Sequence, residues 1–193
     1  MLDAFRSARA ALDSLLADAG LCDQAAAVPA MLADRFRAGS KILACGNGGS
    51  ACDAMHFCEE LTGRFRHDRP PLAAIACTDA GHITCTANDY GFERVFSRWV
   101  QALGRPGDTL IALSTSGNSL NIVAAIEAAR AGGLHTIGLL AQGGGRARGL
   151  CDIELVFPGT GSDRIQELHM LVLHAWVEGI ELEMGFTPRP KTR

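Results

Sequence analysis

Short apolar runs alternate with longer segments of helical spacing along most of this chain. Five runs have the length and composition of buried strands: residues 41–45, 72–77, 108–113, 136–140 and 153–157. Helical spacing is found in the stretch around His56, at 79–91, at 93–103, in the alanine-rich stretch up to Gly132 and at 163–184. Strands that alternate with helices predict an α/β fold with a five-stranded parallel sheet, a three-layer αβα sandwich of the flavodoxin-like kind.

Two further helices are predicted ahead of the first strand. Residues 3–19 and 22–38 both show helical apolar spacing, with Gly20 between them and Gly39 after them. A doubly wound sheet does not need this N-terminal helical hairpin. We therefore expect the hairpin to pack across the fold or against another subunit.

The length of the chain fits one domain. Its 193 residues are enough to bury a full core without disulfides. We expect a single domain over residues 1–186, with the N-terminal helices at 1–39 and the αβα core at 40–186. The segment 187–193 has two prolines, three basic residues and no apolar face, and is predicted to be disordered.

Composition argues for a cytoplasmic protein without a nucleic-acid or membrane partner. The chain is 48% hydrophobic and 20% charged with a formal net charge of −3, so it offers no basic surface for nucleic acid. No apolar run approaches the roughly 20 residues that cross a bilayer, and the N-terminus is charged. The seven cysteines are odd in number and never spaced C-x-x-C, which favours reduced thiols.

A glycine-rich turn follows the first predicted strand and opens a helix. The turn, Gly46-Asn47-Gly48-Gly49-Ser50, leaves backbone N–H groups unpaired and directs them, with the positive end of the helix dipole, at one point. An anionic or polyhydroxylated ligand fits such a point. Along the same helix, His56 and Glu60 are four residues apart and share a face, which lets both side chains converge on one metal ion or substrate atom.

The same turn also satisfies the dinucleotide pattern G-x-G-x-x-A, from Gly46 to Ala51. Asp79, after the second predicted strand, could supply the acidic residue that such a site needs. A dinucleotide site would leave the second polar loop and the pair of His56 and Glu60 unexplained. We therefore rank it below a sugar phosphate site.

That second polar loop follows the third predicted strand. It carries four hydroxyl groups and a glycine ahead of a helix, in the sequence Ser114-Thr115-Ser116-Gly117-Asn118-Ser119. This composition can hold a phosphate without a lysine or a metal, although a helix cap with a turn explains it equally well in isolation. Both loops should open at the same edge of the sheet, which favours phosphate binding.

The closing helix carries polar residues in an otherwise apolar stretch: Gln166, Glu167, His169 and His174. A lone histidine in such a helix is more often a core residue than a ligand. Gln166 and His174 are eight positions apart, so they are offset by about 80° and by about 12 Å along a straight helix. One metal ion can hardly bind both from the same helix. If both belong to one active site, the simplest arrangement has one of them donated by a neighbouring subunit.

Four blocks of sequence together resemble the phosphoheptose isomerases of the SIS fold: GNGGSACDAMHFCEELTGRF, ANDYGFERVFSRWVQALGRPGD, ALSTSGNSLNI and DRIQELHMLVLH. The resemblance spans residues 40–184. It implies an aldose–ketose isomerase that converts D-sedoheptulose 7-phosphate to D-glycero-D-manno-heptose 7-phosphate through an enediol. This is the first step towards ADP-heptose for bacterial surface polysaccharides such as lipopolysaccharide. It further implies a homotetramer with one Zn²⁺ per subunit and active sites between subunits.

The resemblance also assigns roles to individual residues. The zinc ligands would be His56, Glu60, Gln166 and His174, with Glu60 as the catalytic base and His174 as the acid. The substrate contacts would be Asn47, Gly48, Gly49, Asn88, Asp89, Ser114, Thr115, Ser116, Ser119 and Gln166. A carboxylate bound to zinc loses basicity, so either Glu60 leaves the metal during turnover, or Glu59 or a water on the metal contributes.

A non-enzymatic relative of the same fold is the alternative. Some SIS tetramers bind the replication initiator protein, and other SIS domains sense sugar phosphates. Loss of the metal and acid–base residues would be expected in such a binding protein. Because all four proposed metal ligands are present, we favour the enzyme.

Overall fold

The computed structural model describes residues 1–159 and 161–186, so the predicted disordered tail lies outside the described part. The strands are β1 (Ile42–Gly46), β2 (Ala74–Ala76), β3 (Thr109–Ser114), β4 (His135–Ala141) and β5 (Ile153–Phe157). The helices are α1 (Leu2–Ala17), α2 (Ala19–Arg37), α3 (Gly49–Thr62), α4 (Ala80–Tyr90), α5 (Val95–Leu103), α6 (Leu120–Ala131) and α7 (Ser162–Glu183), with the 3₁₀ turns η1 (Phe92–Arg94) and η2 (Gln142–Ala147). Within this part the strands form one parallel sheet in the order β2-β1-β3-β4-β5.

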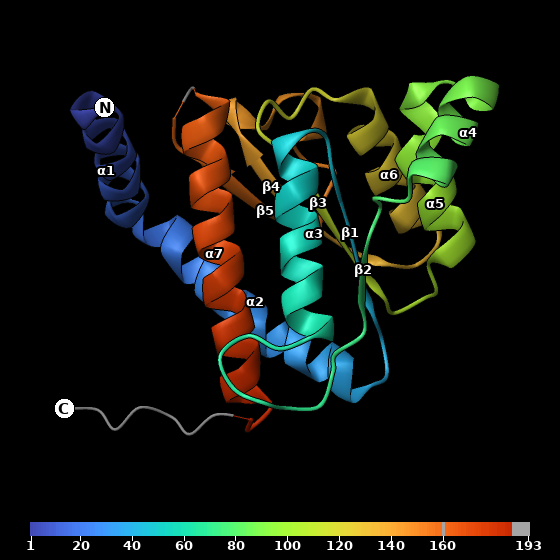
Figure 1. Ribbon diagram of the computed structural model, residues 1–193, viewed down its shortest axis with the longest axis horizontal. Helices are drawn as coiled ribbons and strands as arrows, with labels where there is room; N and C mark the ends of the chain where they lie inside the picture. The colour runs from blue at the N-terminus through green and yellow to red at the C-terminus, as the bar shows by residue number, and fades with distance from the viewer. Residues whose placement is uncertain (160, 187–193) are drawn as a thin grey trace.

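Helices cover both faces of the sheet, which confirms the predicted three-layer αβα sandwich. Successive residues of a strand point to opposite faces. In β1, Ile42 and Ala44 therefore join the core under α2, α3 and α7, whereas Leu43 and Cys45 join the core under α5 and α6. Figure 1 shows α3 and α7 on one side of the strands and α4, α5 and α6 on the other.

Two element boundaries differ from those that the pattern predicts. The second strand is shorter than residues 72–77, because it is an edge strand that pairs only with β1, through Ala74, Ile75 and Ala76. The helix predicted from residue 93 begins with the 3₁₀ turn η1 before it continues as α5.

The two N-terminal helices are present, but they do not fold back on each other as a closed hairpin. They meet at a bend of 82°, and both contact α7 (Figure 1). The break falls at Asp18 and not at Gly20, because Asp18 Oδ1 accepts a hydrogen bond of 2.9 Å from the Leu21 N–H and caps α2. Among the described helices, none alone has the length and apolar character to span a membrane; α1 and α2 meet those two criteria only as a bent pair.

A proline inside α2 creates the contact that holds α7 in place. Pro29 has no N–H, so the Ala25 carbonyl one turn earlier loses its helical partner. The indole N–H of Trp176 on α7 donates to this carbonyl at 2.9 Å. At Gly179 of α7, a Cβ atom would lie 2.7 Å from the Pro29 ring. The glycine therefore allows α2 to pack closely against the helix that carries His174.

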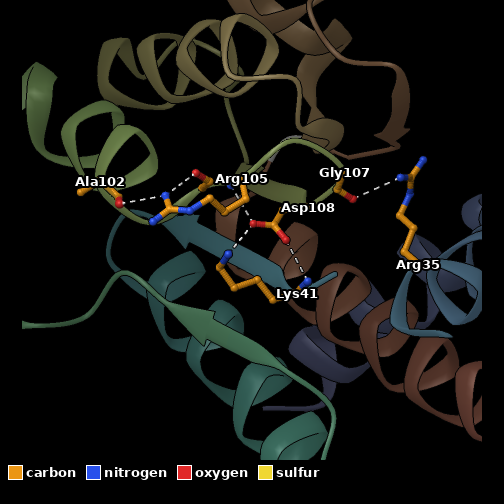
Figure 2. A network of polar contacts seen from close by, with 7 residues as sticks. Arg35, Lys41, Ala102, Arg105, Gly107 and Asp108 are labelled. Carbon is orange, nitrogen blue, oxygen red and sulfur yellow. Dashed lines mark hydrogen bonds and ion pairs between the residues drawn. The ribbon is translucent and has the colours of Figure 1, made fainter. Parts of the chain in front are cut away.

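A polar network fixes the amino ends of β1 and β3, at the edge of the sheet opposite the two polar loops (Figure 2). The Asp108 carboxylate accepts hydrogen bonds from the backbone N–H of Lys41 at 3.0 Å and of Arg105 at 2.8 Å, and it pairs with the Lys41 ammonium. Burial alone would raise the pKa of Asp108, but these partners hold it below its usual value. Arg35 of α2 donates to the Gly107 carbonyl at 3.3 Å and ties this edge to the helical layer.

His169 of α7 is a core residue, as expected for a lone histidine on an apolar helix. Its ring packs edge-on against Phe157, with 4.7 Å between ring centroids, and neither ring nitrogen has a well-formed hydrogen bond within the described chain. Burial lowers the pKa of His169 to about 4, and the backbone of Leu140 offsets only part of this shift.

The buried His169 should make the protein less stable in mild acid. The unfolded chain takes up a proton at this residue near pH 6.5, whereas the folded chain does so only near pH 4. The contribution of His169 to the free energy of unfolding is therefore fully present above pH 6.5. It falls by up to about 3 kcal/mol as the pH drops towards 4. Urea unfolding between pH 7 and 4.5 should show a smaller pH dependence for His169→Leu than for the wild type. The exposed His67→Gln variant should keep the wild-type slope, and an unchanged slope in His169→Leu would contradict the prediction.

Candidate active site

The two polar loops meet in one cleft at the carboxyl ends of the neighbouring strands β1 and β3. The cleft has a volume of about 320 Å³. It is lined by Asn47, Gly48, Gly49, Ser50, Leu113, Ser114, Thr115, Ser116, Ser119, Ser162 and Gln166. Eight of the ten residues predicted to contact substrate lie here, although residues 47–49 and 114–119 are far apart in the sequence. Ser162 was not predicted for this site, and only the packing of α7 against α3 brings it there.

Glycines shape the cleft at the start of α3. Gly48 has a φ of +56°, a conformation that side-chain-bearing residues rarely adopt. At Gly49, a Cβ atom would lie 2.5 Å from Gln166 Oε1. Gly49 therefore gives Gln166 of α7 the space to lie across the first turn of α3.

A buried amide pair joins the two loops. Asn47 and Asn121 exchange two hydrogen bonds of 2.9 Å between their side-chain amides. Asn121 lies in the first turn of α6 and is only 3% exposed. The side-chain oxygen of Asn47 and one of its amide hydrogens are thus used to hold the two loops together. No sequence pattern indicates this role of Asn121, because the pair depends on the adjacency of β1 and β3.

The hydroxyl groups of the second loop have different functions. Ser114 Oγ accepts the Gly117 N–H and Ser116 Oγ accepts the Asn118 N–H, both at 3.1 Å, so these two side chains form the turn. Thr115 donates to Ser162 Oγ at 3.3 Å. Ser119 precedes α6 without making a side-chain cap. The turn that was the alternative to phosphate binding thus explains Ser114 and Ser116. The Ser119 hydroxyl caps no helix and lines the cleft.

Asp79, the residue that a dinucleotide site would need, caps a helix instead. Its Oδ1 atom accepts the His82 N–H at 2.6 Å at the start of α4. The Asp79 carboxylate is thus engaged in capping α4, which argues further against a dinucleotide site.

Two helical turns below the cleft, His56, Glu60 and His174 form a cluster. Glu60 Oε1 lies 3.2 Å from His56 Nε2 and 3.3 Å from His174 Nε2. One donor atom from each residue can be chosen so that all lie within 4.8 Å of one another. His56 and Glu60 lie on α3 as their spacing predicts, and the packing of α7 beside α3 adds His174 from the same chain (Figure 1).

The cluster has the donor chemistry of a metal site. Glu60 Oε2 is buried and has no hydrogen-bond partner within the described chain. A buried, unpaired carboxylate oxygen is costly unless another group binds it. Two imidazoles and a carboxylate form a ligand set that zinc commonly uses. Phe65 stacks on the His174 ring, with 5.9 Å between centroids, and limits access from that side.

Gln166 lies in the cleft and is separated from this cluster. Both α3 and α7 begin at the cleft, and the eight positions of α7 from Gln166 to His174 correspond to a rise of about 12 Å. The chain thus brings three of the four predicted metal ligands together, whereas Gln166 lies about two helical turns from His174 along α7.

Asn88 and Asp89 do not line the cleft. They lie exposed at the end of α4, where Asn88 donates to Asp89 Oδ1 at 2.7 Å. Helix α4 is on the face of the sheet opposite α3 and α7 (Figure 1). Within one chain, these two residues are therefore separated from the other predicted substrate contacts.

Comparison with known proteins is consistent with this site. Residues 5–141 match the SIS domain family. The chain is 57% identical over 150 residues to the phosphoheptose isomerase of Fusobacterium nucleatum subsp. nucleatum, which covers 78% of this chain and 77% of the relative. It is 56% identical over 155 residues to the phosphoheptose isomerase of Yersinia enterocolitica, covering 80% of each. The structure of a phosphoheptose isomerase from Neisseria gonorrhoeae matches with a TM-score of 0.85 at 39% identity, over 94% of this chain and 96% of that one.

These matches confirm the resemblance that the four sequence blocks indicate, and they agree with the fold. The chain therefore belongs to the SIS domain family, among the phosphoheptose isomerases, and is a sugar phosphate isomerase.

Proposed function

We propose that this chain converts D-sedoheptulose 7-phosphate to D-glycero-D-manno-heptose 7-phosphate through an enediol. This reaction would be the first step towards ADP-heptose for surface polysaccharides such as lipopolysaccharide, and it would take place in the cytoplasm. The observation that carries the proposal is the juxtaposition of a hydroxyl-lined cleft with a His–Glu–His cluster on two parallel helices. Membership of a family of sugar phosphate isomerases supports the interpretation of this arrangement as a sugar phosphate site.

The cleft would bind the phosphate end of the substrate. The helices α3 and α6 both begin at its rim, and helix N-termini favour anions. Its described lining contains no lysine or arginine, so backbone N–H groups and the hydroxyls of Thr115, Ser119 and Ser162 would provide the hydrogen bonds. Asn88 and Asp89 are retained as proposed substrate contacts, which would have to come from a second subunit.

His56, Glu60 and His174 would hold a zinc ion. When bound, the ion would polarise the substrate carbonyl and stabilise negative charge on the enediolate oxygens. The orphaned Oε2 atom of Glu60 supports this assignment, because it is a buried acceptor that lacks a partner in the chain.

Glu60 would move the proton between C1 and C2, and His174 would exchange the hydroxyl protons. Bound to zinc, Glu60 would be a weak base, but its two oxygens have different surroundings. Oε1 contacts both imidazoles, whereas Oε2 is unpaired. Glu60 would therefore act as the base only when it is released from the ion during turnover. Glu59 is a weaker candidate for the base because its side chain is 64% exposed.

We further propose that the complete site forms between subunits of a homotetramer. Gln166 is the fourth proposed ligand, and the rise of about 12 Å along α7 between it and His174 favours a contribution to the ion of a second subunit. Gln166 also lines its own cleft. If it completes the metal site of a second subunit, then the cleft of one subunit must face the cluster of the other.

Turnover of sedoheptulose 7-phosphate tests the proposed function. Purified protein should be active, lose activity on chelation, recover it with zinc and show about 10²–10⁴-fold lower activity as His174→Gln, because a general acid contributes about that factor. Solvent deuterium in the product would support the enediol route. No turnover by a folded, zinc-loaded protein would instead favour another sugar phosphate or a binding function.

A further inference from the structure

Asp53 lies between the cleft and the His–Glu–His cluster on the same face of α3. It follows Gly49 by four positions and precedes His56 and Glu60 by three and seven. These spacings place the four residues along one stripe of the helix. At about 1.5 Å of rise per residue, Asp53 stands roughly midway between the start of the helix and the centre of the cluster.

The carboxylate of Asp53 is half-buried and incompletely paired. Its Oδ2 atom is shielded from solvent and has no hydrogen-bond partner within the described residues. Burial raises the pKa of Asp53 to about 6, and the nearby His56 offsets part of that shift. An unsatisfied buried acceptor destabilises the folded chain. Neither a helix cap nor a salt bridge at Asp53 compensates for this cost in the described chain.

The ring of His56 has one nitrogen available for a second partner. Both of its carboxylate contacts are made by Nε2, which lies 3.2 Å from Glu60 Oε1 and 3.9 Å from Glu59 Oε1. This leaves Nδ1, on the opposite side of the ring. A histidine that binds a metal through one nitrogen usually donates the other N–H to a carboxylate, a carbonyl or water, which fixes its tautomer. Residues three apart on a helix are neighbours, and two acidic residues, Asp53 and Glu59, have that spacing from His56. Glu59 approaches Nε2, which leaves Asp53 as the candidate partner of Nδ1.

No hydrogen bond or ion pair joins Asp53 to His56 in the described chain. We propose that Asp53 is a positioning residue for the cluster: once a metal ion is bound, the Asp53 carboxylate accepts the Nδ1–H of His56 and thereby directs Nε2 at the ion. The hydrogen bond would give Asp53 the donor that it lacks, and it would increase the basicity of the imidazole as a ligand. This inference rests on the proposed metal site. It does not depend on which sugar phosphate is the substrate.

Zinc affinity, measured by competition with a chromophoric chelator, tests the proposal. Asp53→Asn keeps the shape of the side chain and removes its charge, and it should weaken zinc binding about 10–100-fold. The metal-free variant should be no less stable to urea than the wild type, because the substitution removes a poorly paired carboxylate. Asp53→Glu should recover part of the affinity.

Glu59→Gln is the matched control. It removes the same charge from a neighbouring position of α3, but the Glu59 side chain is 64% exposed and solvent screens it. Its effect on zinc affinity should be much smaller than that of Asp53→Asn. Equal losses in the two variants would assign the effect to net charge and overturn the proposal.

A spectroscopic measurement separates positioning from a structural effect. In the zinc-loaded wild type, the Nδ1–H proton of His56 should resonate at the low field that a hydrogen bond to a carboxylate produces, and Asp53→Asn should move this resonance to higher field. Wild-type zinc affinity together with an unchanged Nδ1–H resonance in Asp53→Asn would overturn the inference and leave the metal site standing. A wild-type chain that binds no zinc would overturn both.

Discussion

Co-expressed His174→Gln and Gln166→Ala subunits are expected to recover about one quarter of wild-type isomerase activity, although each variant alone should be nearly inactive. In a symmetric oligomer with random mixing, about half of the clusters are intact and about half of these face an intact cleft. His174 belongs to the cluster and Gln166 to the cleft. The expected recovery follows because each variant supplies the part of the site that the other lacks.

The measurement needs mixed oligomers of known composition. Subunits with two different affinity tags can be purified in tandem after co-expression and assayed with sedoheptulose 7-phosphate. The matched control pairs His174→Gln with His56→Ala. Both substitutions fall in the cluster of a single chain, so this mixture should stay inactive. A mixture of His174→Gln and Gln166→Ala without activity would show that the site is not shared, whereas the metal site itself would be unaffected by that result.

Glu181→Leu is expected to lower the free energy of unfolding by about 3–5 kcal/mol, because it leaves a buried guanidinium without its counter-charge. Arg69 Nε donates to Glu181 Oε1 at 2.9 Å, and both side chains are 2% exposed. Arg69 also donates to the Leu61 carbonyl at 2.7 Å and to the Glu60 carbonyl, in the last turn of α3. These are carbonyls that a helix end leaves unpaired.

The ion pair also connects the two helices that carry the cluster. Glu60 and His174 lie on α3 and α7, and Arg69 joins the end of α3 to Glu181 on α7. Glu181→Leu should therefore weaken zinc binding as well as stability. Urea unfolding at one fixed protein concentration measures the stability change, which avoids the concentration dependence of oligomers.

The double variant Arg69→Met, Glu181→Leu is the control for this interpretation. Replacing both charges by apolar groups should recover part of the stability, because no unpaired charge remains buried. Recovery should be incomplete, because the Glu60 carbonyl loses the donor that Arg69 supplies, at a cost of about 1–3 kcal/mol, whereas the Leu61 carbonyl keeps the Leu72 N–H. A Glu181→Leu variant as stable as the wild type would contradict the assigned role of the pair.

Much of the site follows from short-range sequence pattern. Strand and helix periods predict the sheet, and the carboxyl ends of β1 and β3 must then present their loops at one edge. The four-residue spacing of His56 and Glu60 places them on one face of α3. Helical rise likewise separates Gln166 from His174. Each of these predictions depends on a repeat that a few neighbouring residues determine.

The remaining features depend on contacts between residues that are far apart in the chain. His174 joins Glu60 only because α7 packs beside α3, and Asn121 pairs with Asn47 only because β1 and β3 are adjacent. Arg69 and Glu181 are 112 positions apart. Likewise, the sequence placed the first helical break at Gly20, whereas the cap at Asp18 and packing on α7 determine it.

The sequence by itself thus determined the order of elements, the two polar loops and the residue types available for chemistry, because backbone periodicity and turn chemistry are local. The tertiary structure decided which of these residues meet, which carboxylates lose their partners on burial and which amide is used to fix the cleft. Those outcomes depend on how α2, α3 and α7 pack on the sheet, and packing selects among many pairings that the sequence pattern alone leaves equivalent.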